Sequence, residues 1–137
     1  MKIESQFNID KNLAADVKKQ AILALTALDD KKAQDLVCIS LLGKSPVADS
    51  LVIATATSNT HARALLDAVL KAFKENGLKI KNIEGEQVGE WVILDTGDIM
   101  VHIFQEDARE KYRLEKLWAH NFDLDTTHDE DSLKVAK

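Results

Sequence analysis

Apolar residues recur at helical spacing in two stretches of the chain. The first stretch follows Asp10, a residue type that often caps helices, and ends at the charged run of residues 29–32. Its apolar positions are Ala14, Val17, Ala21, Ala24, Leu25 and Leu28. The second stretch follows Ser58 or Asn59, either of which could cap it, and Gly77 stands where a left-handed residue commonly ends a helix. Its stripe consists of Ala62, Leu65, Leu66, Val69 and Phe73. The pattern predicts two amphipathic helices.

Shorter apolar runs have the composition of β-strands. Residues 36–42 and 50–57 contain β-branched residues and lie beside glycine or proline, and residues 80–83 form a third, shorter run. Two more runs, residues 91–94 and 99–104, flank a four-residue segment that contains Gly97, whose backbone can take a positive φ. This arrangement predicts a hairpin that leads into a last helix.

The hairpin can be given a register. An even-numbered loop centred on Thr96 and Gly97 predicts one mixed face and one aliphatic face. The mixed face pairs Asp95 with Asp98, Ile93 with Met100 and Trp91 with His102. The aliphatic face pairs Leu94 with Ile99 and Val92 with Val101. The aliphatic face belongs in the core, whereas the mixed face suits contact with a partner. A three-residue loop with a bulge would mix the two sets.

The predicted order of elements is α-β-β-α-β-β-β-α. It indicates an α/β domain with a mixed central sheet of about five strands and flanking helices. The length of 137 residues fits one domain. We expect that domain over residues 10–119, preceded by an N-terminal extension, residues 1–9, and followed by an acidic tail, residues 120–137, that is disordered.

Charge and composition narrow the function. The net charge is −5, and the last 18 residues hold five acidic and two basic side chains, so the rest of the chain carries about −2. Without a basic cluster, direct reading of nucleic acid is disfavoured. Cys38 is the only cysteine, which excludes an internal disulfide and a cysteine-built zinc site. No apolar run reaches 18 residues and no signal peptide is visible, so a cytoplasmic protein is expected.

Catalytic chemistry has weak support in the sequence. Asp49, Asp95 and Asp98 could be proposed as a magnesium site, but nucleotidyl transferases place two carboxylates on alternate positions of one strand, and here Asp49 stands alone. Gly43-Lys44-Ser45 lacks the earlier glycine of a phosphate-binding loop. His61 and His102 have no partner at ligand spacing, and a structural role is the better account of each.

Several of these residues together resemble the signature of the ribosomal silencing factor family, also called the Iojap-related family. The hairpin part consists of Trp91, Asp95, Gly97, Asp98, His102, Ile103 and Phe104, and the helix part of Arg109, Tyr112, Leu114, Glu115, Leu117 and Trp118. The upstream part consists of Gly43, Lys44, Ser45, Asp49, Thr55, Ser58, His61, Gly77, Glu84 and Gly85. The resemblance covers roughly residues 13–118 and leaves the acidic tail outside.

The resemblance implies a nucleotidyl-transferase-like fold without transferase chemistry, and no catalytic residue, metal or cofactor. It also implies a partner, the large ribosomal subunit, contacted through large-subunit ribosomal protein fourteen, so that the small subunit cannot join and translation is repressed. The expected partner-binding residues are Trp91, Ile93, Asp95, Thr96, Asp98, Met100, His102, Arg109 and Tyr112. The alternatives are a metal-dependent nucleotidyl transferase and a module that forms a homodimer through the hairpin face. Arg109 could equally be a solvated charge.

Overall fold

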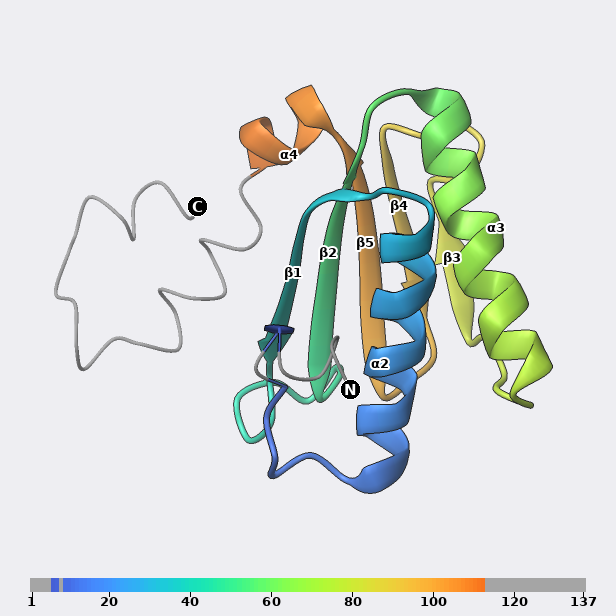
Figure 1. Cartoon of the computed structure of the whole chain (residues 1–137). Helices are drawn as coiled ribbons and strands as arrows, with labels where there is room; N and C mark the ends of the chain where they lie inside the picture. Colours follow the sequence, from blue (N-terminus) through green and yellow to red (C-terminus); the bar gives the residue numbers. More distant parts are fainter. Residues whose placement is uncertain (1–5, 8, 113–137) are drawn as a thin grey trace, which may run out of the picture.

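The structure is a computed structural model that describes residues 6, 7 and 9–112. Its elements, labelled in Figure 1, are α2 (Ala15–Asp30), β1 (Gln34–Ser40), β2 (Ser50–Ala56), α3 (Asn59–Glu75), β3 (Asn82–Glu84), β4 (Trp91–Asp95), β5 (Ile99–Gln105) and α4 (Glu106–Tyr112). The predicted order of elements and the mixed sheet of five strands are therefore confirmed. None of the helices in this described part is long and apolar enough to cross a membrane.

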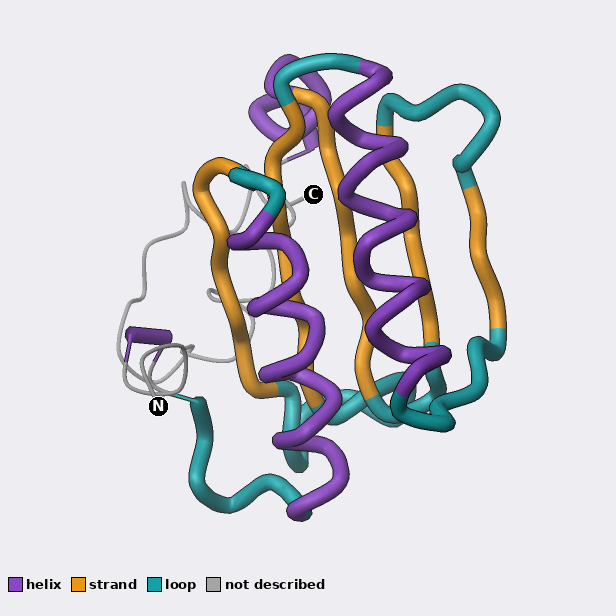
Figure 2. The backbone as a smooth tube through the Cα atoms, turned by 45° about the vertical axis from the view of Figure 1, so that its right-hand side comes forward, coloured by secondary structure: helices purple, strands orange, loops and turns teal. Residues whose placement is uncertain are grey.

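The five strands form one sheet in the order β1-β2-β5-β4-β3. Only the central pair, β2 and β5, is parallel, and the other three pairs are antiparallel. The connection from β2 to β5 contains α3, β3 and β4. Figure 2 shows that α2 and α3 lie side by side on the same face of the sheet. The two faces therefore have different environments.

The main core lies between the sheet and these two helices. Alternate residues of β2, β4 and β5 point toward α2 and α3, because successive side chains of a strand alternate between faces. They are Val52, Ala54, Ala56, Val92, Leu94, Ile99, Val101 and Ile103. The helices contribute Val17, Ala24, Leu25, Leu28, Ala62, Leu65, Leu66, Val69 and Phe73. Apart from Ala14, which is exposed and precedes α2, the apolar stripes read from the sequence are thus the buried stripes of both helices. The aliphatic hairpin face is in the core as predicted.

A second, smaller apolar cluster lies on the opposite face. It consists of Leu41, Ala48, Leu51, Ile53, Phe104 and Ala108, with the half-buried Val37, Ile39, Trp91 and Met100 packed against it. The β1–β2 connection and α4 contribute to this cluster, whereas α2 and α3 do not. The face away from the two long helices is therefore apolar as well.

The predicted pairing within the hairpin was wrong by two residues, although the two faces were assigned correctly. The structure pairs Asp95 with Met100, Leu94 with Val101, Ile93 with His102, Val92 with Ile103 and Trp91 with Phe104. The turn causes the shift, because the Thr96 hydroxyl accepts from the N–H groups of Asp98 and Ile99 and draws Ile99 toward the loop. Since a shift of two residues preserves the side-chain alternation, each strand residue stays on its predicted face. Asp98, predicted on the mixed face, lies in the turn and accepts from Gln20 of α2 instead.

Two helix caps were predicted, and one was wrong. Ser58 caps α3 by accepting from the N–H of His61, as expected. Asp10 does not cap α2, which begins five residues later and has no side-chain cap. The Asp10 carboxylate instead accepts from the Asn12 N–H and from the Ser40 hydroxyl at 2.7 Å, and so holds the N-terminal segment to the end of β1.

Gly85 is the glycine that the fold depends on most. Its φ is +78°, and a Cβ built on it would lie 2.0 Å from the carbonyl oxygen of Trp91. Gly77 has a similar φ of +72° but no atom within 4 Å of such a Cβ. The two glycines therefore share a backbone conformation and differ in the space around them.

We predict that Gly85→Ala lowers the free energy of unfolding by about 3 kcal/mol or more, because it adds a backbone clash to the strain of a positive φ. Gly77→Ala, the matched control, should cost about 1 kcal/mol from that strain alone. Urea unfolding of both variants measures the difference. Equal losses would mean that the β3–β4 connection does not approach Trp91 as closely as described.

Candidate functional site

The candidate site is the face of the β4–β5 hairpin that points away from α2 and α3. Trp91, Ile93, Asp95 and Met100 lie on it and are half-buried, and we call these four residues the hairpin surface. Sequence reasoning placed all four on this face. Beside them on the same face, His102 is only 4% exposed and Phe104 is fully buried. The face therefore has a buried layer beneath its accessible residues.

Three aromatic rings join these two layers. The ring centroids of Trp91 and Phe104 lie 4.9 Å apart in a stacked arrangement, and those of Trp91 and His102 lie 5.9 Å apart. The Trp91 indole Nε1–H donates a hydrogen bond of 2.9 Å to Nδ1 of His102. The indole is thus held both by ring stacking and by a directed hydrogen bond.

His102 lies below the hairpin surface, not on it as we expected. Burial lowers the pKa of its imidazole to about 4, so the ring is neutral at pH 7. Because Nδ1 accepts the indole proton, the ring proton of this neutral form is on Nε2. A direct role in partner contact would require the ring to become more accessible.

The hairpin tip is tied to α2 through Gln20, which sequence reasoning missed. The buried side chain of Gln20 donates to the Asp98 carboxylate at 2.9 Å and accepts from the Thr96 hydroxyl at 2.6 Å. The Asp95 carboxylate accepts from the N–H of Gly97 within the turn. Thr96 and Asp98, both expected to bind a partner, therefore have internal roles that orient the hairpin against the helix.

Arg109 is 8% exposed, so it is not a solvated charge, which was one of the two alternatives that the sequence left open. Its guanidinium donates to the Thr55 hydroxyl at 2.7 Å and to the backbone carbonyl of Asp35. Asp35 has a φ of +46° and lies where the pairing of β1 with β2 is irregular, so its carbonyl is available to a side chain. Arg109 therefore fastens α4 to β1 and β2. The side chain of Tyr112 and residues 114–118 of the resemblance lie outside the described residues.

His61 has the structural role that the sequence favoured. Its Nδ1 accepts from the Thr57 N–H at 2.9 Å, and its Nε2 is 2.8 Å from the carbonyl oxygen of Lys31. The ring therefore bridges the end of α2 and the start of α3.

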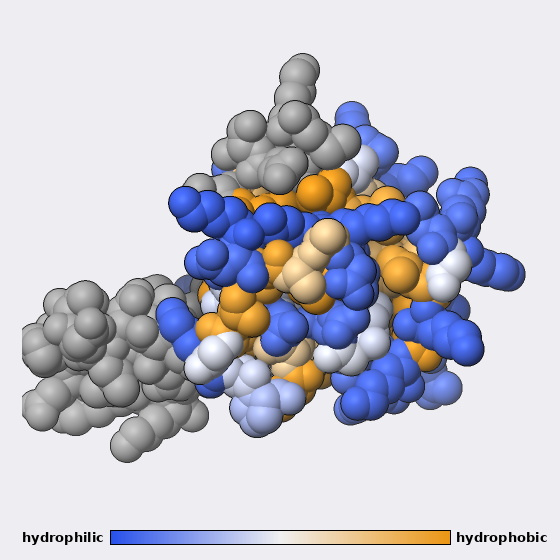
Figure 3. All heavy atoms as spheres, turned by 90° about the horizontal axis from the view of Figure 1, so that it is seen from below, coloured by the Kyte–Doolittle hydropathy of each residue, from blue (hydrophilic) through white to orange (hydrophobic). Residues whose placement is uncertain are grey.

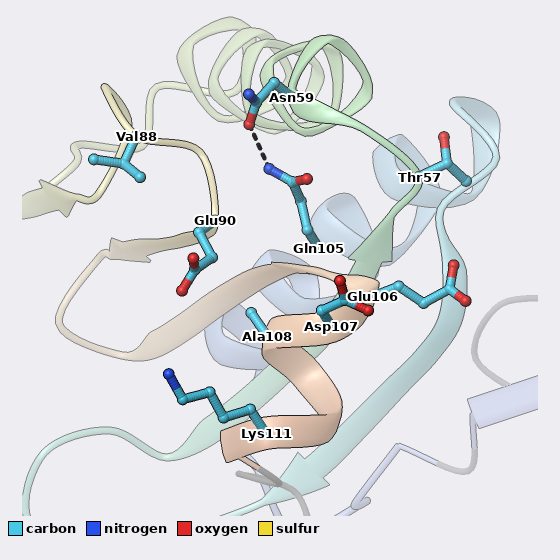
Figure 4. Close-up of a pocket in the computed structure, with 9 residues that line it drawn as sticks. All are labelled: Thr57, Asn59, Val88, Glu90, Gln105, Glu106, Asp107, Ala108 and Lys111. Atoms are coloured by element: carbon cyan, nitrogen blue, oxygen red, sulfur yellow. Dashed lines mark hydrogen bonds between the residues drawn. The ribbon is translucent and has the colours of Figure 1, made fainter.

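The polar hollow in Figure 4 lies at the carboxyl ends of β2 and β5 and has a volume of about 720 Å³. Glu90, Glu106, Asp107 and Lys111 line it, together with Asn59 and Gln105, which are hydrogen-bonded to each other, and Thr57, Val88 and Ala108. Sequence reasoning did not identify this hollow, because the elements that meet there are far apart in the chain. In the described part of the chain, no three His, Cys, Asp or Glu side chains converge as a set of metal ligands.

The opposite end of the molecule carries the β1–β2 and β4–β5 connections. Viewed from that end, apolar patches are interrupted by hydrophilic side chains (Figure 3). Leu42 and Val47 of the β1–β2 connection are 36% and 54% exposed. Single exposed apolar residues are ordinary on protein surfaces. The hairpin surface, with its tryptophan, is the stronger candidate for partner contact.

Comparison with known proteins points to one family. The sequence model described as "Ribosomal silencing factor during starvation" matches residues 14–137, a range that includes the acidic segment left outside the resemblance. A ribosomal silencing factor of Halalkalibacterium halodurans is 41% identical over 96 residues, which is 70% of this chain and 82% of that protein.

Two further relatives extend the comparison. A crystal structure of a Chromobacterium violaceum protein is similar with a TM-score of 0.73 and 33% identity, over 75% of this chain and 86% of that one. A mouse protein named for mitochondrial assembly of the ribosomal large subunit is 30% identical over 101 residues, which is 70% of this chain and 43% of the mouse protein.

The fastening of α4 can be tested by comparing two arginines. We predict that Arg109→Met lowers the free energy of unfolding by about 2–4 kcal/mol, because it leaves the Thr55 hydroxyl and the Asp35 carbonyl without this donor. The control is Arg63→Met, because Arg63 forms an exposed ion pair with Glu86 at 3.6 Å, and it should cost about 1 kcal/mol or less. Chemical denaturation measures both, and similar losses would contradict the buried role of Arg109.

Proposed function

We propose that this chain, because it belongs to the ribosomal silencing factor family, represses translation by binding the large ribosomal subunit and preventing the small subunit from joining. The name of the mouse relative connects that protein with the large subunit and supports this choice of partner. The proposed place of action is the cytoplasm.

The observation that carries the proposal is the half-buried Trp91, which lies on the face of the sheet that α2 and α3 do not cover. Tryptophan dominates many protein interfaces because a large rigid ring buries much apolar area at a small cost in conformational entropy. Ile93 and Met100 lie beside it and extend the apolar area, and Asp95 adds one carboxylate at the turn. This composition suits a protein partner better than a nucleic acid.

We further propose that the contacted protein is large-subunit ribosomal protein fourteen, on the face of the large subunit that meets the small one. The mechanism is occlusion, in which the bound factor occupies space that the small subunit requires. No covalent step is involved, and two of the three candidate metal-binding carboxylates already have hydrogen-bond roles. Asp95 accepts from Gly97, and Asp98 accepts from Gln20. Self-association through the same surface as a homodimer would compete with ribosome binding.

We predict that the purified protein sediments with isolated large subunits and reduces the formation of joined ribosomes from purified subunits. The reason is steric, so inhibition should increase with occupancy of the large subunit and should need no nucleotide. Sucrose-gradient sedimentation measures both effects. Equal joining with and without saturating protein would contradict the proposal. Nucleotide transfer with magnesium that Asp49→Asn abolishes would favour the enzyme alternative instead.

We predict that Trp91→Ala weakens large-subunit binding by about 2 kcal/mol, roughly thirtyfold, because an anchor side chain is removed. Stability should fall by only about 1–2 kcal/mol, because the half-buried ring loses its stacking on Phe104 but leaves no closed cavity. The control is Leu23→Ala, whose residue lines the groove between α2 and α3 on the other side of the sheet and should leave binding unchanged. Normal binding by Trp91→Ala would show that the partner uses another surface.

A further inference from the structure

Trp91 presents a polar group as well as an apolar ring, and the structure assigns a use to each. The indole N–H is directed along the sheet face to His102 on β5 and is 2.9 Å from its Nδ1. The apolar ring is stacked on Phe104, which is fully buried. His102 and Phe104, which lie on the same face of β5, thus together define the orientation of the indole.

The ladder register explains why His102 can do this. Phe104 is the direct partner of Trp91 across the strand pair, and His102 is its diagonal neighbour on the same face. Direct and diagonal neighbours on one face are within reach of large side chains. The His102 ring itself is fixed, because it is stacked at 16° to Phe104 with a centroid distance of 6.1 Å and is 4% exposed. The acceptor is therefore rigid as well as close.

The protonation state of His102 matches this role. Only a neutral imidazole with its proton on Nε2 offers Nδ1 as an acceptor, because a charged ring carries a proton on Nδ1 that would face the indole N–H. Burial of the ring disfavours the charged form. Asp95 is the titratable residue of the hairpin surface, and it is paired with Met100 and accepts from the Gly97 N–H in the turn. Asp98 is hydrogen-bonded to Gln20 on the side of the sheet that carries α2.

We propose that His102 is a positioning residue of the hairpin surface, which fixes the Trp91 indole through Nδ1 so that the partner meets the apolar ring and not its N–H. This inference rests on the proposed function, since it describes how the same surface recognises the large subunit. It also states a chemical property of the partner. The site that receives Trp91 is an apolar pocket that does not need a hydrogen-bond acceptor, because the indole N–H is already satisfied within the chain.

Two substitutions separate the acceptor from the ring. His102→Phe keeps a flat ring for stacking and removes the acceptor, whereas His102→Asn removes the ring and keeps a side-chain oxygen near the position of Nδ1. We expect His102→Phe to weaken binding to isolated large subunits by about fivefold, the value of one hydrogen bond, and His102→Asn to remain within about twofold of the natural protein. Trp91→Phe should bind better than Trp91→Ala, because it keeps an apolar ring.

A spectroscopic measurement on the unchanged protein accompanies the binding assay. In protein labelled with nitrogen-15, a hydrogen bond between Trp91 Nε1–H and His102 Nδ1 gives a scalar coupling between the two nitrogens, and the imidazole shows the Nε2–H tautomer. Trp91→Phe assigns the resonance by removing one of the two indole signals, since the chain has two tryptophans. His102→Phe should abolish the coupling, and it should shift the Trp91 indole signal. The coupling is measured on the unchanged protein and does not depend on the ribosome.

The outcomes separate the inference from the function on which it rests. A protein that binds large subunits, shows the coupling and loses binding in His102→Phe but not in His102→Asn supports the positioning role. Unchanged binding by His102→Phe, equal loss in both variants, or absence of the coupling overturns it while the proposed function stands. An unchanged protein that fails to bind large subunits overturns the proposed function, and the positioning role with it, even if the coupling is present.

Discussion

The parallel pairing of β2 with β5 is the constraint on which the rest of the structure depends. A parallel pair requires a long connection, and here that connection contains α3 and then the strands β3 and β4. Because α3 packs beside α2 on one face, the aliphatic residues of the central strands have a closed core on that face. The side chains on the opposite face alternate with these and must be accommodated differently. They form the smaller cluster around Phe104, with α4 at one end and Trp91 at its border.

Polar side chains connect these elements at several points. Gln20 joins α2 to the turn of the hairpin, His61 joins the end of α2 to the start of α3, and Arg109 joins α4 to β1 and β2. Each connects segments that are far apart in sequence, and Gln20 and Arg109, which are buried, also satisfy groups whose burial without a partner would be costly. Their directional bonds define the relative positions of elements that apolar packing alone would leave freer to slide.

Periodicity in the sequence was enough to predict the helices, the five strands and the two faces of the hairpin, because each depends on the alternation of residues within one short segment. The pairing register was missed because it depends on the Thr96 hydroxyl, which closes the turn one residue further along than a loop centred on Thr96 and Gly97. The burial of Arg109 was missed because charged residues are usually solvated, and its acceptors, the Thr55 hydroxyl and the Asp35 carbonyl, lie far from it in the sequence. The polar hollow beyond β5 had no local signal at all.

In the candidate site, too, the sequence predicted which face a residue lies on but not how deeply it is buried. The family signature contains Trp91 and His102 together, and sequence reasoning treated them as equivalent contact residues, although one is half-buried and the other almost fully buried. Residues that act on a partner and residues that hold them in place can share a motif, since both are needed at defined positions on one strand face. An anchor that is held before binding loses less conformational entropy when it binds than one that must be ordered by the partner. A buried ring beneath an accessible one is therefore as much a part of a docking surface as the ring that makes the contact.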